Sequence, residues 1–400
     1  MPKKHKEKIN RSGIKIINLS AFIQGISAAS IIYLESDYFK ISAGSDNISL
    51  FFIVAYAVSL FLIFNWHYLI HKWGKKKVFL GNLFAKGLAL FALSFLPVGK
   101  VGILFLMMYI ILIIMSWIDL DILLETYSRD SQTGRIRGKY LTIMNLGYLV
   151  SPFFAGLIVD HWGFGPIFFL ATLLTFSLFF LNYFFIRRAE TDGVRSINFR
   201  NLLKQLLSRP NISRIFYISF LLEFFYALMV IYVPLYLLEL GFSWADLGEI
   251  FTFMLVPFVI LQYPAGFLAD KKYEEKHMLI VALAVMAAST FSIFFLETTN
   301  LFLWGAVLFF TRVGASLIEI LRDSYFYKRI DSRDIDIINF FRSLRPLASI
   351  TGLLIAAPIV YFLHIRFVFP LVAIASLSGI FTAANLAHNH ILPKKKARKA

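Results

Sequence analysis

Hydrophobic residues fall in long uninterrupted runs along most of the chain, and short polar segments separate these runs. Each run holds about twenty residues, the length that an α-helix needs to cross the roughly 30 Å hydrocarbon core of a bilayer. The runs lack the alternation of apolar and polar residues that is typical of transmembrane β-strands. We therefore predict twelve transmembrane helices, over residues 14–35, 48–70, 78–98, 101–122, 140–161, 164–186, 212–239, 246–269, 278–297, 300–322, 337–363 and 366–388.

Composition supports this interpretation and excludes other classes. Hydrophobic residues make up 58% of the 400 residues, charged residues only 16%, and Phe alone contributes 44. Soluble domains carry about 45–50% apolar and about 25% charged residues. The chain contains no cysteine, which excludes a secreted scaffold held by disulfides. The expected fold class is an all-α membrane protein.

The formal net charge of +16 predicts an orientation rather than a nucleic-acid partner. Of the 40 Lys and Arg residues, 35 lie in the two tails and the even-numbered loops, and only 3 lie in the opposite loops. Cytoplasmic loops of membrane proteins carry such an excess. We expect a multi-pass protein of the plasma membrane or the bacterial inner membrane, with both termini cytoplasmic. The basic tail at 394–399 suits anionic lipid.

The chain divides near its middle, at the longest polar connection. Within that connection, residues 199–209 place their leucines mostly on one helical face, which predicts an amphipathic helix on the membrane surface. We expect four parts: an N-terminal six-helix bundle with a basic tail at 1–186, a cytoplasmic linker at 187–211, a C-terminal six-helix bundle at 212–388, and a basic tail at 389–400.

An internal repeat relates the two predicted bundles. At an offset of 198–199 residues Gln24 matches Glu223, Asp121 matches Glu319, and further matches occur in other span pairs. Transporters whose site lies at the interface of two repeats are built in this way. We therefore predict two pseudo-symmetric six-helix bundles around a central cavity.

Short motifs connect the chain to a known family. The turn after the second span reads HYLIHKWGKK at 67–76, the eighth span ends in GFLADKK, and the fifth span carries GYLVSPFFAG. Together with twelve spans and a long central loop, these resemble the major facilitator superfamily, whose turn motif reads G-x-L-A-D-R-x-G-R-K. His67 and His71 replace its first Gly and its Asp. The resemblance implies a transporter whose cavity is lined by helices 1, 4, 7 and 10, and the fifth-span motif, similar to a proton-antiporter signature, favours export.

Charged side chains within the spans are the candidate functional residues. A charge at the centre of a membrane helix costs about 2.5–3.5 kcal/mol, so each one needs a partner or a water-filled cavity. Apart from Lys86, which we expect to extend to the inner interface, the charges lie on spans 4, 7 and 10. The residues predicted for the substrate cavity or for proton coupling are Gln24, Asp119, Asp121, Glu223, Arg312 and Glu319.

Two of these residues are predicted to pair across the cavity in at least one state of the transporter. Glu223 and Arg312 each lie about ten residues from the cytoplasmic end of their spans, so both are roughly 15 Å deep, near the midplane. A carboxylate beside a mobile cation can accept a proton when the cation moves away. A static structural ion pair is the alternative. By contrast, Asp119 faces nearly opposite Asp121 on its helix, so both cannot point into the cavity.

A second constellation predicts a gate at the cytoplasmic ends of the helices. Asp121 with Glu125, and Glu319 with Asp323, are spaced four residues apart, and like charges at that spacing repel unless cations lie nearby. We expect ion pairs that break when the cavity opens inward; a permanently solvated helix end is the alternative. The predicted gate residues are Lys72, Gly74, Lys75, Lys76, Glu125, Gly266, Asp270, Lys271, Asp323, Arg342 and Arg345.

No other chemistry is predicted. The chain has no nucleotide-binding loop and no nucleophile set for an intramembrane enzyme, and we expect no cofactor. His67 and His71 have helical spacing for a metal, but no Cys or carboxylate lies nearby in the loop, so we interpret them as interfacial. The sequence predicts a monomeric secondary transporter of a small molecule that works by alternating access, is coupled to protons and leans towards export. A non-transporting membrane receptor or scaffold on the same fold is the alternative.

Overall fold

The computed structural model of the chain describes residues 11–45, 47–127, 133–186, 199–271, 275–330 and 335–387. Over these residues eleven helical segments are long and apolar enough to cross a membrane. The helices are α1 (Arg11–Ala29), α2 (Glu35–Ala43), α3 (Ser49–Trp73), α4 (Lys75–Phe95), α5 (Lys100–Tyr127), α6 (Thr133–Trp162), α7 (Phe164–Phe185), α8 (Phe199–Ser208), α9 (Pro210–Glu239), α10 (Trp244–Ile260), α11 (Gln262–Lys271), α12 (Glu275–Ser292), α13 (Leu301–Tyr327), α14 (Ile335–Phe362) and α15 (Val368–Ala384), with 3₁₀ turns η1 (Ile293–Phe295) and η2 (Ile365–Phe367).

The first predicted span is not one continuous helix. It consists of α1, a turn at residues 30–34, and α2, which runs on well past the predicted end at residue 35. In the turn the amides of Ile31 and Leu34 bond carbonyls only three residues back, the tighter pattern of a 3₁₀ turn. The segment of α1 and α2 corresponds to the first predicted span but is not among the eleven segments that are long and apolar enough to cross a membrane.

The eighth span is also interrupted. It is divided at Leu261 into α10 and α11, with Pro257 inside the last turn of α10 and Pro264 in the first turn of α11. A proline has no amide hydrogen to donate and clashes with the preceding turn, so breaks of this kind are expected beside it. Gln262, the first residue of α11, follows this break directly.

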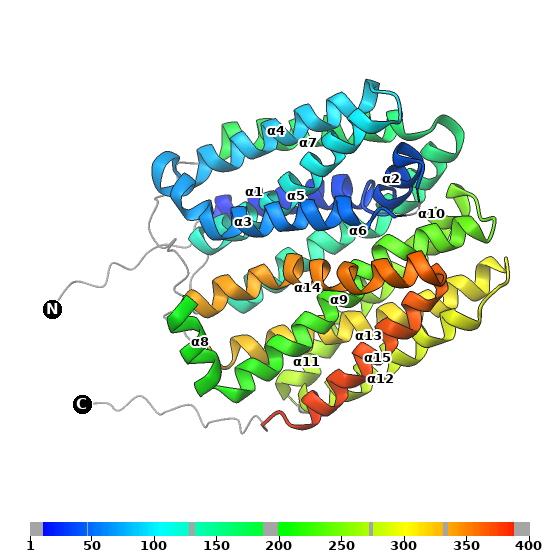
Figure 1. Cartoon of the computed structure of the whole chain (residues 1–400). Coiled ribbons are helices and arrows are strands. Elements are labelled where there is room, and N and C mark those ends of the chain that lie inside the picture. Colours follow the sequence, from blue (N-terminus) through cyan, green and yellow to red (C-terminus); the bar gives the residue numbers. More distant parts are fainter. Residues whose placement is uncertain are drawn as a thin grey trace, which may run out of the picture.

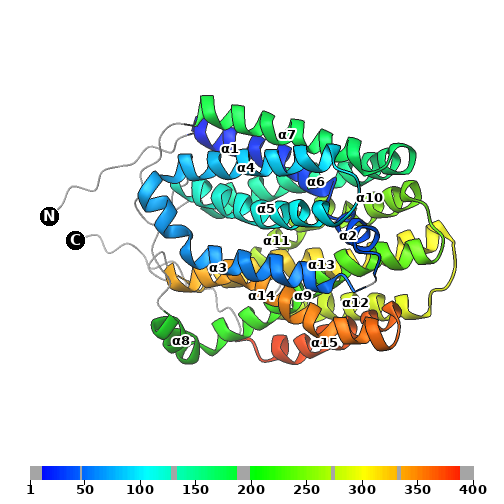
Figure 2. The same ribbon diagram turned by 45° about the horizontal axis from the view of Figure 1, so that its top comes forward.

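The helices form two bundles with the same internal packing (Figure 1). In the first half (α1–α7), α1 packs on α6 and α7, and α4 packs on α5 and α7. In the second half (α9–α15), α9 packs on α14 and α15, and α12 packs on α13 and α15, which are the equivalent pairs in chain order. The halves meet where α6 packs on α10 and α3 on α14; Figure 2 shows the second of these pairs side by side. The protein is therefore an all-α membrane protein of two pseudo-symmetric six-helix bundles.

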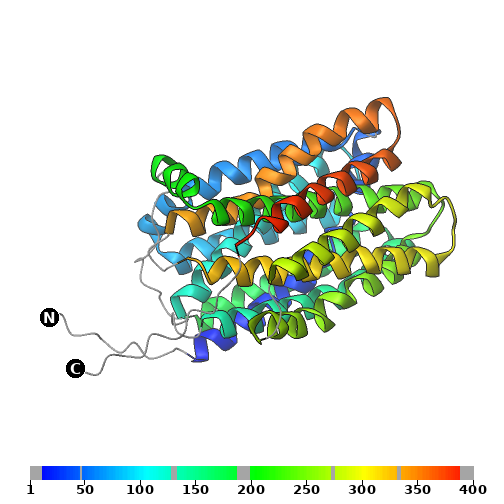
Figure 3. The same cartoon turned by 90° about the horizontal axis from the view of Figure 1, so that it is seen from below.

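The two ends of the bundle are distinct. The start of α1, the α3–α4 turn, α8 and the end of α15 lie at one end, which we call the tail end (Figure 3). The other end, the far end, carries the turns α4–α5, α6–α7, α9–α10 and α14–α15. At the tail end Gly74 joins α3 to α4 with φ +84°, a left-handed conformation that glycine adopts without the steric cost of a side chain.

The predicted amphipathic helix in the linker is present as α8. It packs on α9 and α14, with Leu202 buried and Leu207 and Lys204 exposed. Residues 187–198 of the linker lie outside the described part of the chain.

The outer surface of the two bundles is rich in large apolar side chains. Phe61, Phe95, Phe184 and Phe381 are among those that are mostly exposed. Such a surface is favourable against lipid tails and unfavourable against water. This accounts for the high phenylalanine content, because many of these side chains face lipid rather than a protein core.

Candidate functional site: a charged cavity between the halves

A narrow cavity lies where the first half meets α14 of the second. Its volume is about 30 Å³ in this structure, enough for one or two water molecules and far below the range of about 300–1,000 Å³ for ligand sites. Most of its walls are aromatic or aliphatic. It is lined by Ala28, Ile32, Glu35, Tyr56, Tyr109, Ile110, Ile113, Ile114, Trp117, Tyr148 and Arg345.

Two charged side chains line the cavity without a direct partner. Glu35, at the start of α2, is 6% exposed, and Arg345, on α14, is exposed to the cavity. Among the described residues neither makes a hydrogen bond or a salt bridge, but the two opposite charges attract each other across the cavity. Ionisable groups inside a membrane protein are a candidate functional site. Arg345 was predicted as a gate residue and instead lines the cavity.

The aromatic walls complement these charges. Tyr56, Tyr109, Trp117 and Tyr148 come from α3, α5 and α6 and surround the space on the side of the first half. Aromatic faces attract cations, and phenol and indole groups add hydrogen-bond donors to an otherwise apolar surface. The lining therefore suits a molecule with an aromatic body that carries charged groups, which could enter only if the walls moved apart.

Glu223, on α9, pairs with an arginine other than the predicted one. Its carboxylate lies 3.0 Å from Arg322 on α13, and that arginine also lies 3.5 Å from Asp323. The expected Glu223–Arg312 pair does not form in this structure. Arg322 lies almost three turns along α13 from Arg312, and its direction around the helix brings it to Glu223.

Arg312 is buried among aromatic rings. It is 2% exposed, its guanidinium lies 5.0 Å from the ring centre of Phe225 and 5.8 Å from that of Tyr226, and Tyr33 from the first half lies close enough to interact with it. Among the described residues it has no carboxylate partner. Its charge is therefore stabilised by the electron-rich faces of the rings, at the contact between the two halves.

Asp119 lies inside the first half rather than in the cavity. Trp66 Nε1 on α3 donates to it at 2.6 Å and Asn82 Nδ2 on α4 at 3.1 Å. The prediction that Asp119 and Asp121 face different directions is consistent with this packing. Because three helices meet at this one carboxylate, its role in the structure is to hold α3, α4 and α5 together.

Lys86 does not extend to the interface as predicted. It is fully buried on α4, and its ammonium donates to Gln24 Oε1 on α1 at 3.0 Å. Gln24 therefore binds within the first half instead of lining the cavity. No carboxylate pairs with Lys86 among the described residues.

Glu319, on α13, takes part in a hydrogen-bonded chain that crosses between the halves. It accepts from Gln262 Nε2 at 3.1 Å and from the Tyr226 hydroxyl at 3.4 Å. Gln262 Oε1 in turn accepts from Asn145 Nδ2 on α6 at 3.1 Å. Glu319, predicted to take part in proton coupling, is thus linked to the first half through the amide of Gln262. Gln262 was not among the candidate residues predicted from the sequence.

The lysines of the predicted gate bind within their own half in this structure. Lys75 donates to Thr126 Oγ1 on α5 at 3.1 Å, and Lys76 donates to the carbonyls of Tyr183 and Ile186 at the end of α7. A cation at the carbonyl end of a helix is favourable because of the helix dipole. Lys72 is exposed beside Trp73. These contacts fix the tail end of the first half.

For the other predicted gate residues the structure describes only some of the side chains. Gly266 lies against Ile320, Asp323 lies beside Arg322, and Glu125 is exposed at the end of α5. The side chains of Asp270, Lys271 and Arg342 lie outside the described residues. The prediction of a gate therefore remains a prediction.

Comparison with known proteins identifies the fold. The family profile of the Major Facilitator Superfamily matches residues 16–344. The chain belongs to the major facilitator superfamily. This confirms the resemblance that the turn motifs and the twelve spans indicated.

Two curated relatives of the chain carry the same name. "Multidrug resistance protein MdtG" of Salmonella schwarzengrund (strain CVM19633) is 26% identical over 222 residues, which are 53% of this chain and 54% of the relative. The protein of the same name from Salmonella arizonae (strain ATCC BAA-731 / CDC346-86 / RSK2980) is 25% identical over 246 residues, 59% of this chain and 60% of the relative. The matched segments thus span about half to three fifths of these relatives.

In this member of the superfamily the halves are joined at the far end. Ser49 Oγ lies 2.9 Å from the Tyr232 hydroxyl, and Lys40 lies 3.6 Å from Glu239. The amide of Trp244 donates to Asp160 Oδ1 at 3.2 Å. These contacts connect α3 to α9, α2 to α9 and α6 to α10, so the cavity is closed towards the far end.

Two glycines allow α6 and α10 to approach closely. A Cβ on Gly156 would lie 2.3 Å from the Trp244 carbonyl oxygen and 2.9 Å from Gly248 Cα, and a Cβ on Gly248 would lie 2.8 Å from the Pro152 carbonyl oxygen. Small residues permit this backbone contact between membrane helices. Gly156 belongs to the fifth-span motif, and its place in the structure gives that motif a physical role.

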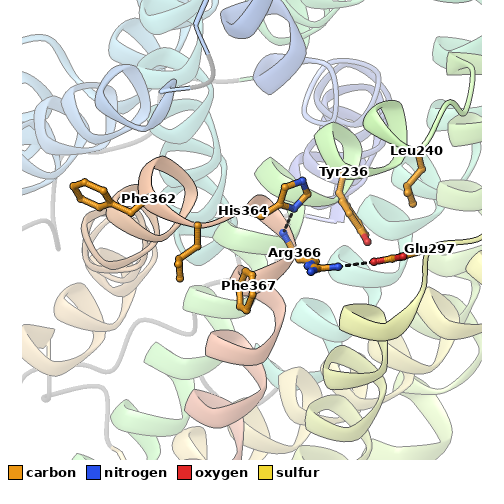
Figure 4. A pocket seen from close by; sticks show the side chains of 8 residues that line it. Tyr236, Leu240, Glu297, Phe362, His364, Arg366 and Phe367 are labelled. Atoms are coloured by element: carbon orange, nitrogen blue, oxygen red, sulfur yellow. Dashed lines mark hydrogen bonds and ion pairs between the residues drawn. The ribbon is translucent and has the colours of Figure 1, made fainter.

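A second hollow of about 790 Å³ lies at the far end of the second half (Figure 4). Tyr236, His364 and Phe367 form part of its wall, and Arg366 pairs with Glu297 across it. Because its cation and carboxylate neutralise each other, we do not assign it to the central site.

Proposed function

We propose that this protein is a secondary transporter that exports amphiphilic small molecules by alternating access of its two halves. The observation that carries the proposal is the cavity between the halves, in which Glu35 and Arg345 are ionisable groups without direct partners. Keeping two such groups at membrane depth is unfavourable unless a ligand or water stabilises them.

The lining predicts the substrate class. Glu35 attracts a cationic group, Arg345 attracts an anionic group, and the rings of Tyr56 and Trp117 pack against an apolar body. We propose aromatic zwitterions as preferred substrates, and molecules with only one of the two charges as weaker ones. A substrate of this size enters only after the walls move apart, as alternating access requires.

Export, orientation and proton coupling belong to the same proposal. The relatives that match are named multidrug resistance proteins, which supports export. The excess of Lys and Arg in the tails and even-numbered loops supports a cytoplasmic tail end, so the present far-end closure suits loading from the cytoplasm. Glu223, with Glu319 as the second candidate, would carry the coupled proton. Transport by Glu223→Gln with unchanged proton dependence would remove Glu223 from coupling.

The test is transport by the purified full chain in proteoliposomes with an imposed proton gradient. The probes are norfloxacin, an aromatic zwitterion, and ethidium, an aromatic cation. We expect Glu35→Gln to weaken the apparent affinity for both probes by about 10–100-fold, the effect of losing a charged hydrogen bond. Arg345→Gln should weaken transport of norfloxacin and leave that of ethidium nearly unchanged.

The matched control is Glu297→Gln, which neutralises an exposed carboxylate at the far end and should leave both affinities unchanged. If all three variants changed the affinities equally, the cavity residues would not be the ones that bind the substrate. Absence of any flux in wild-type vesicles, with binding of a probe retained, would favour the alternative of a receptor or scaffold on this fold.

A further inference from the structure

The side chain of Gln262 joins a buried carboxylate of one half to the other half. Its Nε2 donates to Glu319 Oε2 on α13, and its Oε1 accepts from Asn145 Nδ2 on α6, both at 3.1 Å. Gln262 is 7% exposed, so water competes little for either bond. One amide therefore connects an ionisable group of the second half with the surface of the first.

The position of the Gln262 amide along the helices determines which end of the contact between the halves it holds. The contact between α6 and α10 begins at the far end, where Trp244 binds Asp160, and continues through Gly156 and Gly248. Gln262 lies eighteen residues beyond Trp244, or about 27 Å along the helix axis, immediately after the break at Leu261. The Asn145–Gln262 bond thus lies towards the tail end of the contact between α6 and the eighth span.

The ionised carboxylate fixes the orientation of the amide. A carboxylate only accepts hydrogen bonds, so it requires Gln262 to present Nε2 to it and leaves Oε1 for Asn145. A protonated Glu319 gains an O–H donor, for which Oε1 of Gln262 is the nearby acceptor, and then the donor of Asn145 loses its partner. The other charged or titratable groups near Glu319 are Glu223 and Tyr226 on α9 and Arg322 and Asp323 on α13.

We propose that Gln262 is a positioning residue that transmits the charge of Glu319 to the contact between the halves. Ionised Glu319 strengthens the Asn145–Gln262 bond, which holds α6 to the eighth span towards the tail end. Protonated Glu319 weakens the bond and favours opening of the tail end, which in alternating access accompanies closure of the far end. The inference rests on the proposed transport function and gives one of its proton-carrying residues a specific mechanical consequence.

The test measures the far-end distance rather than transport. Because the chain has no cysteine, Lys100→Cys and Thr299→Cys place one spin label on each half, at exposed positions of the far end. Pulsed EPR of the full chain in lipid nanodiscs, at acidic and at mildly alkaline pH, reports the ratio of closed to open molecules. In the otherwise wild-type chain we expect acid to raise this ratio about 2–10-fold, as the loss of one neutral hydrogen bond at the tail end predicts.

Variants separate the effect of the Gln262 amide from the effects of other groups that titrate. Gln262→Leu and Asn145→Ala should each raise the ratio at alkaline pH and remove most of its pH dependence. Glu319→Gln should hold the ratio at one value at both pH values. The control is Asn65→Ala, which removes an amide that binds only the carbonyl of Phe61 on its own helix and should retain the full response.

A full pH response in both Gln262→Leu and Asn145→Ala would overturn the proposal. If one of them fails to fold, the other decides, because each removes the same bond from a different half. Transport assays separate this inference from the function: active transport with an unchanged distance profile refutes only the role of Gln262, whereas a pH-dependent distance without flux refutes only the transport function.

Discussion

Adding a single methyl group at Gly156 should prevent the far end from closing as it does in this structure. In Gly156→Ala the new Cβ would lie 2.3 Å from the Trp244 carbonyl oxygen and 2.9 Å from Gly248 Cα. Both neighbours are backbone atoms of α10, so no side chain can turn aside. To restore an ordinary contact, the helices must separate by about 1 Å at this point.

The size of the effect follows from the cost of overpacking. Inserting a methyl group into a close contact costs typically about 1–3 kcal/mol, and this cost applies only in the state in which α6 and α10 touch. A coupling of that size shifts a two-state equilibrium about 5–150-fold. The variant should therefore favour the state that is open at the far end, while the fold of each half is retained.

The far-end spin-label pair at positions 100 and 299 measures this shift directly. The control is Gly81→Ala on α4, where a Cβ would have no atom within 4 Å, so the distance distribution should not change. We also expect Gly156→Ala to slow transport, because the carrier would rarely reach the state in which the far end is closed. An unchanged distance distribution in Gly156→Ala would refute the reasoning that close packing of α6 on α10 limits opening.

Two further predictions concern the stability of the first half, measured as the apparent melting temperature of the purified protein in detergent. Trp66→Phe removes the hydrogen bond to the buried carboxylate of Asp119 and should destabilise the fold by about 1.5–3 kcal/mol, whereas Asn65→Ala, one residue away, should have little effect; equal melting temperatures for both variants would contradict this. Lys86→Met replaces a buried ammonium whose partner is the neutral Gln24 with an apolar side chain of similar length and should raise the melting temperature; a lower value would show that the charge is stabilised by its surroundings.

The sequence by itself determined the architecture. The length of the apolar runs predicted the eleven long apolar segments of the described residues to within a few residues at most boundaries, since the thickness of the bilayer sets that length. The repeat predicted two similar bundles, and the equivalent helix pairs that pack in each half confirm it. Charges within the spans also marked residues that the structure buries, such as Arg312 and Lys86, because a charge at membrane depth must be stabilised.

Only the tertiary structure decided which charges meet. Glu35 was not among the candidate residues because it stood at the predicted end of the first span, and only the turn that starts α2 brings it to the cavity wall. Arg345, expected at a gate, lines the same cavity, and Arg322 rather than Arg312 reaches Glu223. Hydropathy gives the depth of a residue in the membrane but not its direction around the helix or the neighbour it faces. Those depend on how whole helices pack, which long-range contacts between the halves determine.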